Sequence, residues 1–403
     1  MSRKIPLGLA IAIMFIAIAV TVAITMSVSM RTYNNLIKDL PERARMYSNV
    51  SEIDDIVRAN FYGTVNESLL NSDIYDGYAQ GLGDKYSYYL NPSDYEAYKN
   101  ELNGEKVGIG IIAFYDETET AIYAAEVSEN SPAAQSGIKK GDKIVAIDEE
   151  NVTAYNYKEL MQKLTGGRLS SITVAFERDG AVQAAGVVKG YSAQSVYYSK
   201  NGTVGYIKIT DFYSTTASQL KKAVKALSDD GAGSLIFDLR GTSNGTVKYA
   251  CEALDVLVPI ASDGNGALAI AKDRDGNIVD TFTADADSIS MRMMVLVNNE
   301  TSGPAELFAC DLRDFGKAQL VGNSTAGNGT MQSAFKLSDG GAIVLTVAEI
   351  TPYVSEGYNG TGLTPDYEVK LEAQQRAKLP ILSQADDAQY QKAYNILIGE
   401  DNG

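Results

Sequence analysis

The sequence contains no histidine among its 403 residues. Catalysis by a serine–histidine or cysteine–histidine pair is therefore excluded, because no imidazole is present to take the proton of the nucleophile. Cysteine is also scarce: Cys251 and Cys310 are the only two, and both lie in apolar stretches typical of helices. We expect two buried free thiols rather than a disulfide, and neither a metal nor a cofactor, because the ligands for one are missing.

Basic residues are outnumbered by acidic ones, 35 against 51, which gives a net charge of −16. The imbalance is uneven, since residues 1–45 hold six basic and two acidic residues and leave −20 for the rest. Nucleic acid is not an expected partner of such an acidic body, which has no basic surface to displace counterions from phosphates. The length is sufficient for two or three domains with their own cores.

The N-terminal region carries a long apolar run. Residues 5–30, IPLGLAIAIMFIAIAVTVAITMSVSM, contain no charged residue. At about 1.5 Å per residue this run exceeds the roughly 30 Å of a bilayer core, so it predicts a membrane anchor. Arg3 and Lys4 precede the run and favour a cytoplasmic N-terminus with the body outside the cell membrane. A cleavable signal peptide is the alternative, because residues 27–29 offer small residues at a cleavage site.

A central stretch, residues 293–332, reads MMVLVNNETSGPAELFACDLRDFGKAQLVGNSTAGNGTMQ. Its apolar start over residues 293–297 predicts a strand, and Pro304 marks the first turn of a helix. The polar turn 298–303 joins the two. A strand that turns sharply into a helix is a common place for a nucleophile, because backbone N–H groups there can bind an oxyanion.

This stretch resembles the core of the C-terminal processing (tail-specific) serine peptidases, in which a serine nucleophile works with a lysine base. The family's turn reads approximately N-x-G-S-A-S-A-S-E-I, and its later loop reads T-F-G-K-G-x-x-Q. The shared residues are Asn298, Glu306, Leu307, Thr325, Gly327, Gly329 and Gln332. The resemblance places the nucleophile position at Gly303, the base position at Asn328 and the residue that supports the base at Gln332.

Both catalytic side chains of the family are therefore absent. Glycine has no side chain to acylate, and an asparagine amide cannot take a proton from a hydroxyl near neutral pH, whereas a desolvated lysine can. Residues 238–245, DLRGTSNG, resemble the family's D-L-R-x-N-x-G-G, whose glycine pair is similar to an oxyanion-hole element in active members. Here the pair reads Asn244-Gly245. Ser302 is the fallback nucleophile, although the sequence offers it no evident base.

Residues 104–189 resemble a PDZ domain. The run 131–147, SPAAQSGIKKGDKIVAI, matches the pattern S-P-A-x-x-A-G-I-x-x-G-D-x-I-x-x-I. Its Pro132 should open a short helix and Gly137 should end it, before a strand over residues 144–147. The resemblance implies that a peptide C-terminal carboxylate binds to backbone N–H groups of one loop, with the peptide added as an extra strand. The residues of that loop are Gly108, Ile109, Gly110 and Ile111.

The expected fold is an α/β multidomain chain. Its segments are a cytoplasmic tip and anchor over 1–30, a stem and helical segment over 31–103, the PDZ domain over 104–189, a peptidase-like α/β core over 190–372 and a helical tail over 373–403. The helical segment contains GLGDKYSYYLNP, which is similar to the family's L-G-D-P-Y-S-x-Y-L-x-P with Lys85 in place of a proline; we assign it no chemistry. Tyr390, Tyr394 and Leu397 recur at helical spacing and predict a dimer or docking face.

Three functional hypotheses remain. The first is a membrane-anchored pseudopeptidase that binds peptide C-termini, unfolded chains or a partner protein of the cell envelope through its PDZ domain and its vacant cleft. The second is an active serine endopeptidase that uses Ser302 as nucleophile. The third is a structural envelope protein whose grooves bind no ligand.

Overall fold

The structure is a computed structural model that describes residues 7–37, 40–128, 130–166, 170–259, 267–284, 289–377, 379 and 382–400. The chain divides into two units, Met1–Ile74 and Tyr75–Gly403.

The first unit is helical. Its elements are α1 (Leu7–Ile37), α2 (Leu40–Asn60) and most of α3 (Glu67–Gln80). Arg58 joins the last two, because its guanidinium donates to Asp54 within α2 at 2.7 Å and to Glu67 of α3 at 2.6 and 3.0 Å. Within the described residues, no helix combines the length and the apolar character that crossing a membrane requires. The anchor expected over residues 5–30 therefore stays a prediction.

The second unit begins with a segment that was expected to be helical throughout but contains a strand. It comprises the end of α3, β1 (Tyr88–Leu90) and α4 (Pro92–Leu102). Asn91 caps α4 by accepting from the main-chain N–H of Asp94 at 3.0 Å, and Pro92 takes the first helical position. The strand β1 pairs antiparallel with β20 (Ala342–Pro352), so the sequence periodicity was overridden by a partner about 250 residues away.

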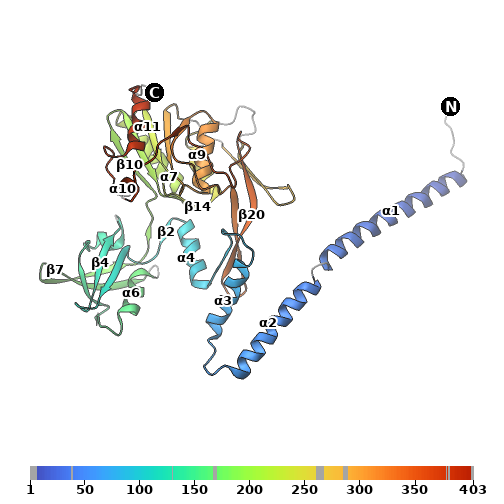
Figure 1. The fold of residues 1–403 in the computed structure, drawn as a ribbon, viewed down its shortest axis with the longest axis horizontal. Helices are drawn as coiled ribbons and strands as arrows, with labels where there is room; N and C mark the ends of the chain where they lie inside the picture. The colour runs from blue at the N-terminus through green and yellow to red at the C-terminus, as the bar shows by residue number, and fades with distance from the viewer. Residues whose placement is uncertain are drawn as a thin grey trace. The chain divides into compact units, whose positions relative to one another are not determined.

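Residues 104–189 form a small β-sheet domain with two helices (Figure 1). The sheet order is β3-β4-β5-β7-β8, with β6 on β5. The elements are β2 (Glu105–Lys106), β3 (Ile111–Asp116), β4 (Ala121–Val127), α5 (Pro132–Gln135), β5 (Lys143–Ile147), β6 (Glu150–Asn151), α6 (Tyr157–Thr165), β7 (Ser171–Arg178) and β8 (Ala181–Val188). The predicted helix at Pro132 and the predicted strand over 144–147 are both confirmed as α5 and β5. Ser131 caps α5 through its side chain.

The core sheet is mainly parallel, in the order β10-β11-β13-β17-β18-β21. Its strands are β10 (Val196–Asn201), β11 (Val204–Ile209), β13 (Ser234–Asp238), β17 (Arg292–Val297), β18 (Ala318–Gly322) and β21 (Tyr367–Glu368), with only β10 antiparallel to its neighbour. The strand predicted over residues 293–297 is confirmed as β17. Buried strands with apolar side chains on both faces are typical of a parallel sheet that is covered on both sides.

Helices cover the two faces of this sheet. Leu235 and Phe237 of β13 belong to one apolar cluster together with buried residues of α7 (Thr216–Asp229), α8 (Val247–Asp255) and α9 (Pro304–Asp314). Ile236, between them, belongs to a second cluster with Tyr390 and Ile396 of α11 (Ala388–Ile398). Because successive strand residues point to opposite faces, α11 lies on the face opposite α7, α8 and α9.

The C-terminal helix therefore docks on the chain's own sheet (Figure 1). In the helical tail expected over residues 373–403, α11 begins at Ala388, after the short α10 (Ala373–Ala377). Tyr390 is fully buried, so the docking reading of this face is supported and the homodimer reading is not.

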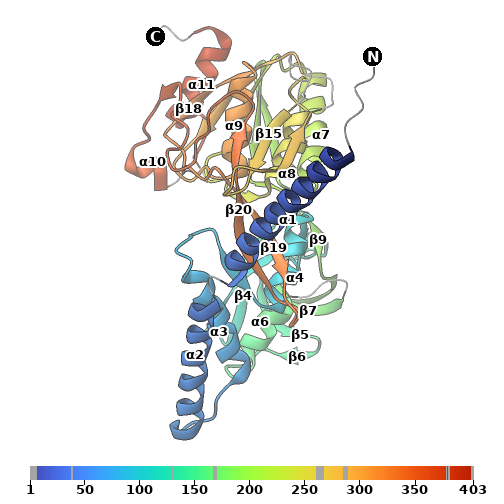
Figure 2. The same ribbon diagram turned by 90° about the vertical axis from the view of Figure 1, so that its right-hand side faces the viewer.

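A second sheet contains a long hairpin of β19 (Thr330–Lys336) and β20, with β15 (Ala267–Lys272), β16 (Ile278–Thr283) and β1 also pairing in it. Residues 337–341 form the turn of this hairpin, in which the N–H of Leu337 donates to the carbonyl of Gly341. Figure 2 shows β19 beside the long β20. Residues of β19 and β20 line the cavity described below, so this hairpin forms part of the site's wall.

Arg240 fastens α11 to the sheet. Its guanidinium donates to Asp238 at 2.6 and 3.0 Å and to Asp387, the N-cap of α11, at 2.7 and 3.1 Å. All three side chains are at most 5% exposed. Removing this buried cation leaves Asp387 without its ion-pair partner, whereas Asp238 keeps the Lys208 ammonium at 3.4 Å.

We predict that Arg240→Met detaches α11 locally. Removing one partner of a buried ion pair costs about 3–5 kcal/mol, which corresponds to more than roughly a hundredfold in an opening equilibrium. Hydrogen exchange of the α11 amides should accelerate by about that factor. Lys225→Met removes an exposed pair with Asp229 on α7 and is the matched control, which should change exchange by less than about threefold. Equal exchange in the two variants would contradict the assigned role of Arg240.

Candidate active site

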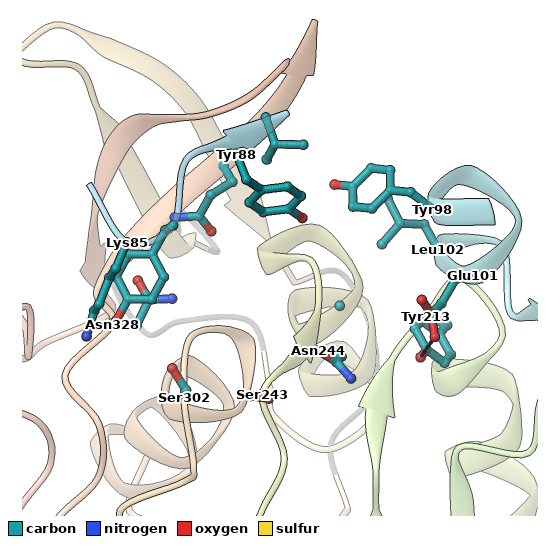
Figure 3. Close-up of a pocket in the computed structure, with 14 residues that line it drawn as sticks. Lys85, Tyr88, Tyr98, Glu101, Leu102, Tyr213, Ser243, Asn244, Ser302 and Asn328 are labelled. Atoms are coloured by element: carbon teal, nitrogen blue, oxygen red, sulfur yellow. Dashed lines mark hydrogen bonds between the residues drawn. The ribbon is translucent and has the colours of Figure 1, made fainter. Parts of the chain in front are cut away.

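A cavity of about 370 Å³ lies at the end of β17 and the start of α9. It is lined by Lys85, Tyr86, Tyr88, Tyr98, Glu101, Leu102, Tyr213, Ser243, Asn244, Gly245, Ser302, Asn328, Gln332 and Val344 (Figure 3). Ser302, Asn328, Gln332, Asn244 and Gly245, which the sequence singled out, therefore meet in one place.

The turn between β17 and α9 is tight and internally bonded. Asn298 accepts the main-chain N–H groups of Gly241, Glu300 and Thr301 at 3.0–3.1 Å. Gly303 ends the turn with φ 58° and ψ −116°. This conformation strains any residue with a Cβ atom, so a glycine relieves a backbone that a serine would strain.

Gly303 and Asn328 are direct neighbours. A Cβ atom placed on Gly303 would lie 3.2 Å from Nδ2 of Asn328. The two positions that the family resemblance assigns to nucleophile and base are therefore adjacent in space, although they are 25 residues apart in the sequence. Neither side chain can perform that chemistry, since one is absent and the other is a neutral amide.

Glu306 joins the two loops, a role that sequence reasoning missed. This fully buried carboxylate accepts from the main-chain N–H groups of Gly303 at 3.0 Å and Asn328 at 2.8 Å through Oε2. Its Oε1 accepts from the N–H of Gly327 at 2.7 Å and from the hydroxyl of Thr325. Four donors to one buried carboxylate compensate its desolvation and fix the turn against the 325–328 loop.

Gln332 acts on Asn328 through a threonine. Its Nε2 donates to the hydroxyl oxygens of Thr330 at 2.8 Å and Thr346 at 3.3 Å. The Thr330 hydroxyl donates in turn to Oδ1 of Asn328 at 2.7 Å. Gln332 therefore orients the side chain at the base position, as the resemblance implied, but indirectly.

Two residues, Asn244 and Pro304, stand where the family resemblance implies donors that bind an oxyanion. Asn244 lies in β14 (Asn244–Gly245), and its Nδ2 donates to Asp211 of β12 (Asp211–Phe212) at 3.2 Å. Gly245 has φ 117°, and a Cβ atom there would lie 2.2 Å from the carbonyl oxygen of Phe212, so this position requires glycine. Pro304 follows Gly303 and carries no N–H, although the N–H after the nucleophile is an oxyanion donor at elbows of this kind.

Ser302 has no evident base. Its main-chain N–H donates to Thr242 at 3.0 Å, and its side chain faces the cavity (Figure 3). Lys85 lines the same cavity, but its hydrogen bond with the Tyr86 side chain raises the pKa of Lys85, which keeps it protonated. Burial lowers the pKa of Lys208, yet that ammonium is held by Asp238 and the carbonyl of Arg240 and does not line the cavity.

The segment before α4 forms one wall of the cavity, although we expected no chemistry from it. Asp84 accepts from the Ser87 hydroxyl at 2.6 Å, and the Ser87 oxygen accepts from the main-chain N–H of Thr346 on β20 at 3.0 Å. These bonds place Lys85, Tyr86 and Tyr88 on the cavity. The tyrosine content of GLGDKYSYYLNP was the available signal, since exposed tyrosines often line binding surfaces.

The predicted peptide-binding loop of the small domain is partly engaged within the domain. Gly108 and Gly110 have φ 73° and 81°, and Ile109 donates its N–H to the carbonyl of Leu164 in α6 at 3.0 Å. At the other end of α6, the rings of Tyr157 and Tyr115 of β3 stack with centroids 3.9 Å apart. Carboxylate capture by this loop stays a prediction. A peptide added along β3 would have to pass this stack.

The two cysteines are buried free thiols, as expected, in α8 and α9. Burial raises the pKa of Cys310 to about 12, so its thiolate is scarce near neutral pH and it is not a nucleophile candidate.

Two family models match the sequence. Peptidase family S41 matches residues 203–369, and the PDZ domain matches residues 123–178. The chain therefore contains a peptidase family S41 domain and a PDZ domain. Both matches lie within the segments predicted as the peptidase-like core and the PDZ domain, and the resemblance to C-terminal processing peptidases is confirmed.

Curated relatives carry the corresponding names. The carboxy-terminal processing protease CtpA of Bacillus subtilis is 27% identical over 329 residues, which cover 81% of this chain and 69% of that protein. A probable CtpA-like serine protease of Staphylococcus aureus is 26% identical over 330 residues, 80% of this chain and 65% of that protein. The chain thus spans about two thirds of the length of these relatives.

A putative S41 protease from Bacteroides fragilis has a similar fold. The comparison gives a TM-score of 0.50 at 18% identity and covers 85% of this chain and 92% of that one. At this identity the likeness speaks for the fold, which agrees with the α/β architecture described above.

We predict that Glu306→Gln loosens both site loops. A glutamine amide group would point toward the main-chain N–H groups that the carboxylate oxygens now accept. Two buried donors would then face each other, which destabilises the closed arrangement of the loops by about 2–4 kcal/mol. Hydrogen exchange over residues 298–303 and 325–329 should therefore accelerate together. Glu300→Gln changes an exposed carboxylate in the same turn and is the matched control. Acceleration of one loop alone would contradict the joining role of Glu306.

Proposed function

We propose that this S41 family chain is a pseudopeptidase that binds peptide tails or a partner protein and does not cleave them. The observation that carries the proposal is the constellation at the turn: Gly303 without a nucleophile, Pro304 without an N–H, and Asn328 where a base would stand. Each removes a different requirement of serine catalysis, namely the attacking oxygen, an oxyanion donor and the proton acceptor.

The retained scaffold supports binding rather than an empty structural role. The cavity remains open at about 370 Å³, and Glu306 and Gln332 still hold the loops around it. An adjoining cavity of about 270 Å³ shares Tyr98, Leu102, Gly245 and Gln332 with it and runs along residues 330–333 of β19. Together they offer a cleft that can take a peptide in extended form.

Membrane attachment is a second part of the proposal. The uncharged run of residues 5–30 is longer than the approximately 20 residues that a spanning helix needs, and its first two residues lie outside the described part. Between Met14 and Met30 the large apolar side chains of α1 are 51–64% exposed. Arg3 and Lys4 favour a cytoplasmic N-terminus and an extracytoplasmic body.

We predict that the full chain in detergent cleaves no unfolded protein and that a serine-reactive phosphonate does not label it. Ser302→Ala should leave this absence of turnover unchanged, because Ser302 has no evident base. The measurement is the release of peptides from a denatured, fluorescently labelled protein. Turnover by the natural chain that disappears in Ser302→Ala would contradict the pseudopeptidase proposal and support the active peptidase instead.

A restoration series tests why the site is inactive. Gly303→Ser with Asn328→Lys places a hydroxyl and an amine side by side on the existing turn. We expect at most traces of turnover, because the donor after residue 303 is still missing. Adding Pro304→Ala supplies that N–H, and a donor of this kind changes the rate by about 10²–10³. Equal turnover of the double and triple variants, with hydrogen exchange showing intact loops in both, would contradict the role given to Pro304.

A further prediction concerns the orientation of the chain in the membrane. Protease added to spheroplasts should degrade the body and leave a membrane-bound N-terminal fragment that resists alkaline extraction. A body protected inside the spheroplast would contradict this orientation, and a mature N-terminus near Met30 would turn the anchor into a signal peptide. A cytoplasmic protein that stays intact is the control for spheroplast integrity.

A further inference from the structure

We propose that the vacated cleft binds the free C-terminal carboxylate of a peptide, with Lys85 and the side-chain amide of Asn328 as its donors. This inference rests on the proposed function, because an active serine and lysine would occupy the same space. It assigns to the cleft a carboxylate site separate from the loop 108–111 of the PDZ domain.

The first donor is Nδ2 of Asn328. The side chain is 8% exposed, its Oδ1 accepts from Thr330, and its main-chain N–H is bonded to Glu306. Nδ2 lies 3.2 Å from the place where a side chain on residue 303 would begin, on the wall of the cavity. An amide donor on a cavity wall can bind an acceptor that enters the cavity.

The second donor is Lys85. Two side chains on the cavity wall carry a full charge at neutral pH, Lys85 and Glu101. Glu101 is neutralised by the Lys106 ammonium and also accepts from the Tyr213 hydroxyl at 3.0 Å. No salt bridge of Lys85 is found in the described part of the chain, although the Glu306 and Asp84 carboxylates attract its charge, and its ammonium lies 4.7 Å from the centroid of the Tyr86 ring. Lys85 is therefore the charged group of the cavity wall without a carboxylate in direct contact.

The charge and the shape favour a peptide carboxylate over a phosphate. One cation balances one carboxylate, whereas a phosphate dianion would leave excess negative charge on a body that is already strongly acidic. The adjoining cavity along residues 330–333 provides room for the residues that precede the carboxylate. β19 pairs with β20, and no other described strand pairs with it, so an extended peptide can add to its second edge.

The test is photo-crosslinking of the full chain in detergent with a short peptide that ends in alanine and carries benzoylphenylalanine at the penultimate position. Mass spectrometry of the digest locates the attachment. We expect crosslinks to residues 85–102, 243–245 or 328–333 with the free acid, and about tenfold fewer with the amidated twin. Lys85→Met and Asn328→Ala should each reduce them about tenfold, and Lys85→Arg should restore them. Lys225→Met, on α7, is the control and should change nothing.

Each other outcome has a defined meaning. Cleft crosslinks that are indifferent to amidation or to Lys85→Met would overturn the carboxylate site. Crosslinks confined to the region of residues 108–111 would overturn it as well, while leaving peptide binding by the PDZ domain in place. No crosslink at either place would count against the binding function as a whole. Competition by inorganic phosphate at the peptide's own concentration would overturn the choice of a carboxylate.

Discussion

The carboxylate of Glu306 is the contact on which the site depends. Glu306 lies in the first turn of helix α9. Three of the four donors to its carboxylate are the main-chain N–H groups of Gly303, Gly327 and Asn328, and the fourth is the Thr325 hydroxyl. Because these bonds go mainly to the backbone, they are indifferent to which side chains stand at 303 and 328. The geometry of a catalytic site can therefore persist in this chain after the catalytic side chains are gone, since geometry and chemistry rest on different atoms.

Much of this arrangement follows from local sequence. The apolar run 293–297, the polar turn and Pro304 predicted the strand, the turn and the helix, because each signal acts within a few residues. The same holds for α7, whose apolar residues recur at helical spacing from Thr216. The resemblance of two motifs was enough to predict that positions 303 and 328 meet, and a separation of 3.2 Å between a Cβ at 303 and Asn328 agrees.

The features that the sequence did not reveal depend on distant partners. The strand β1 exists because Tyr88 pairs with Val344, and this pairing places Lys85 and Tyr86 on the cavity. Local periodicity contains no information about a partner about 250 residues away, so a helical segment was expected there. Likewise, Glu306 served as an alignment landmark, but its four bonds require the later loop to approach, which only the folded chain shows.

A glycine at the nucleophile position also affects the stability of the turn. At φ 58° and ψ −116° a serine strains the backbone by about 1–3 kcal/mol, and glycine at the same position removes that strain. Pro304 adds to this, because a proline at the first helical position fixes a helical φ and omits only an N–H that the helix does not use. Both residues stabilise the turn while they remove an attacking oxygen and an oxyanion donor. If catalysis is absent, as proposed above, these changes stabilise the turn at no functional cost, and the site keeps a cleft lined by the Asn328 amide and the Lys85 ammonium.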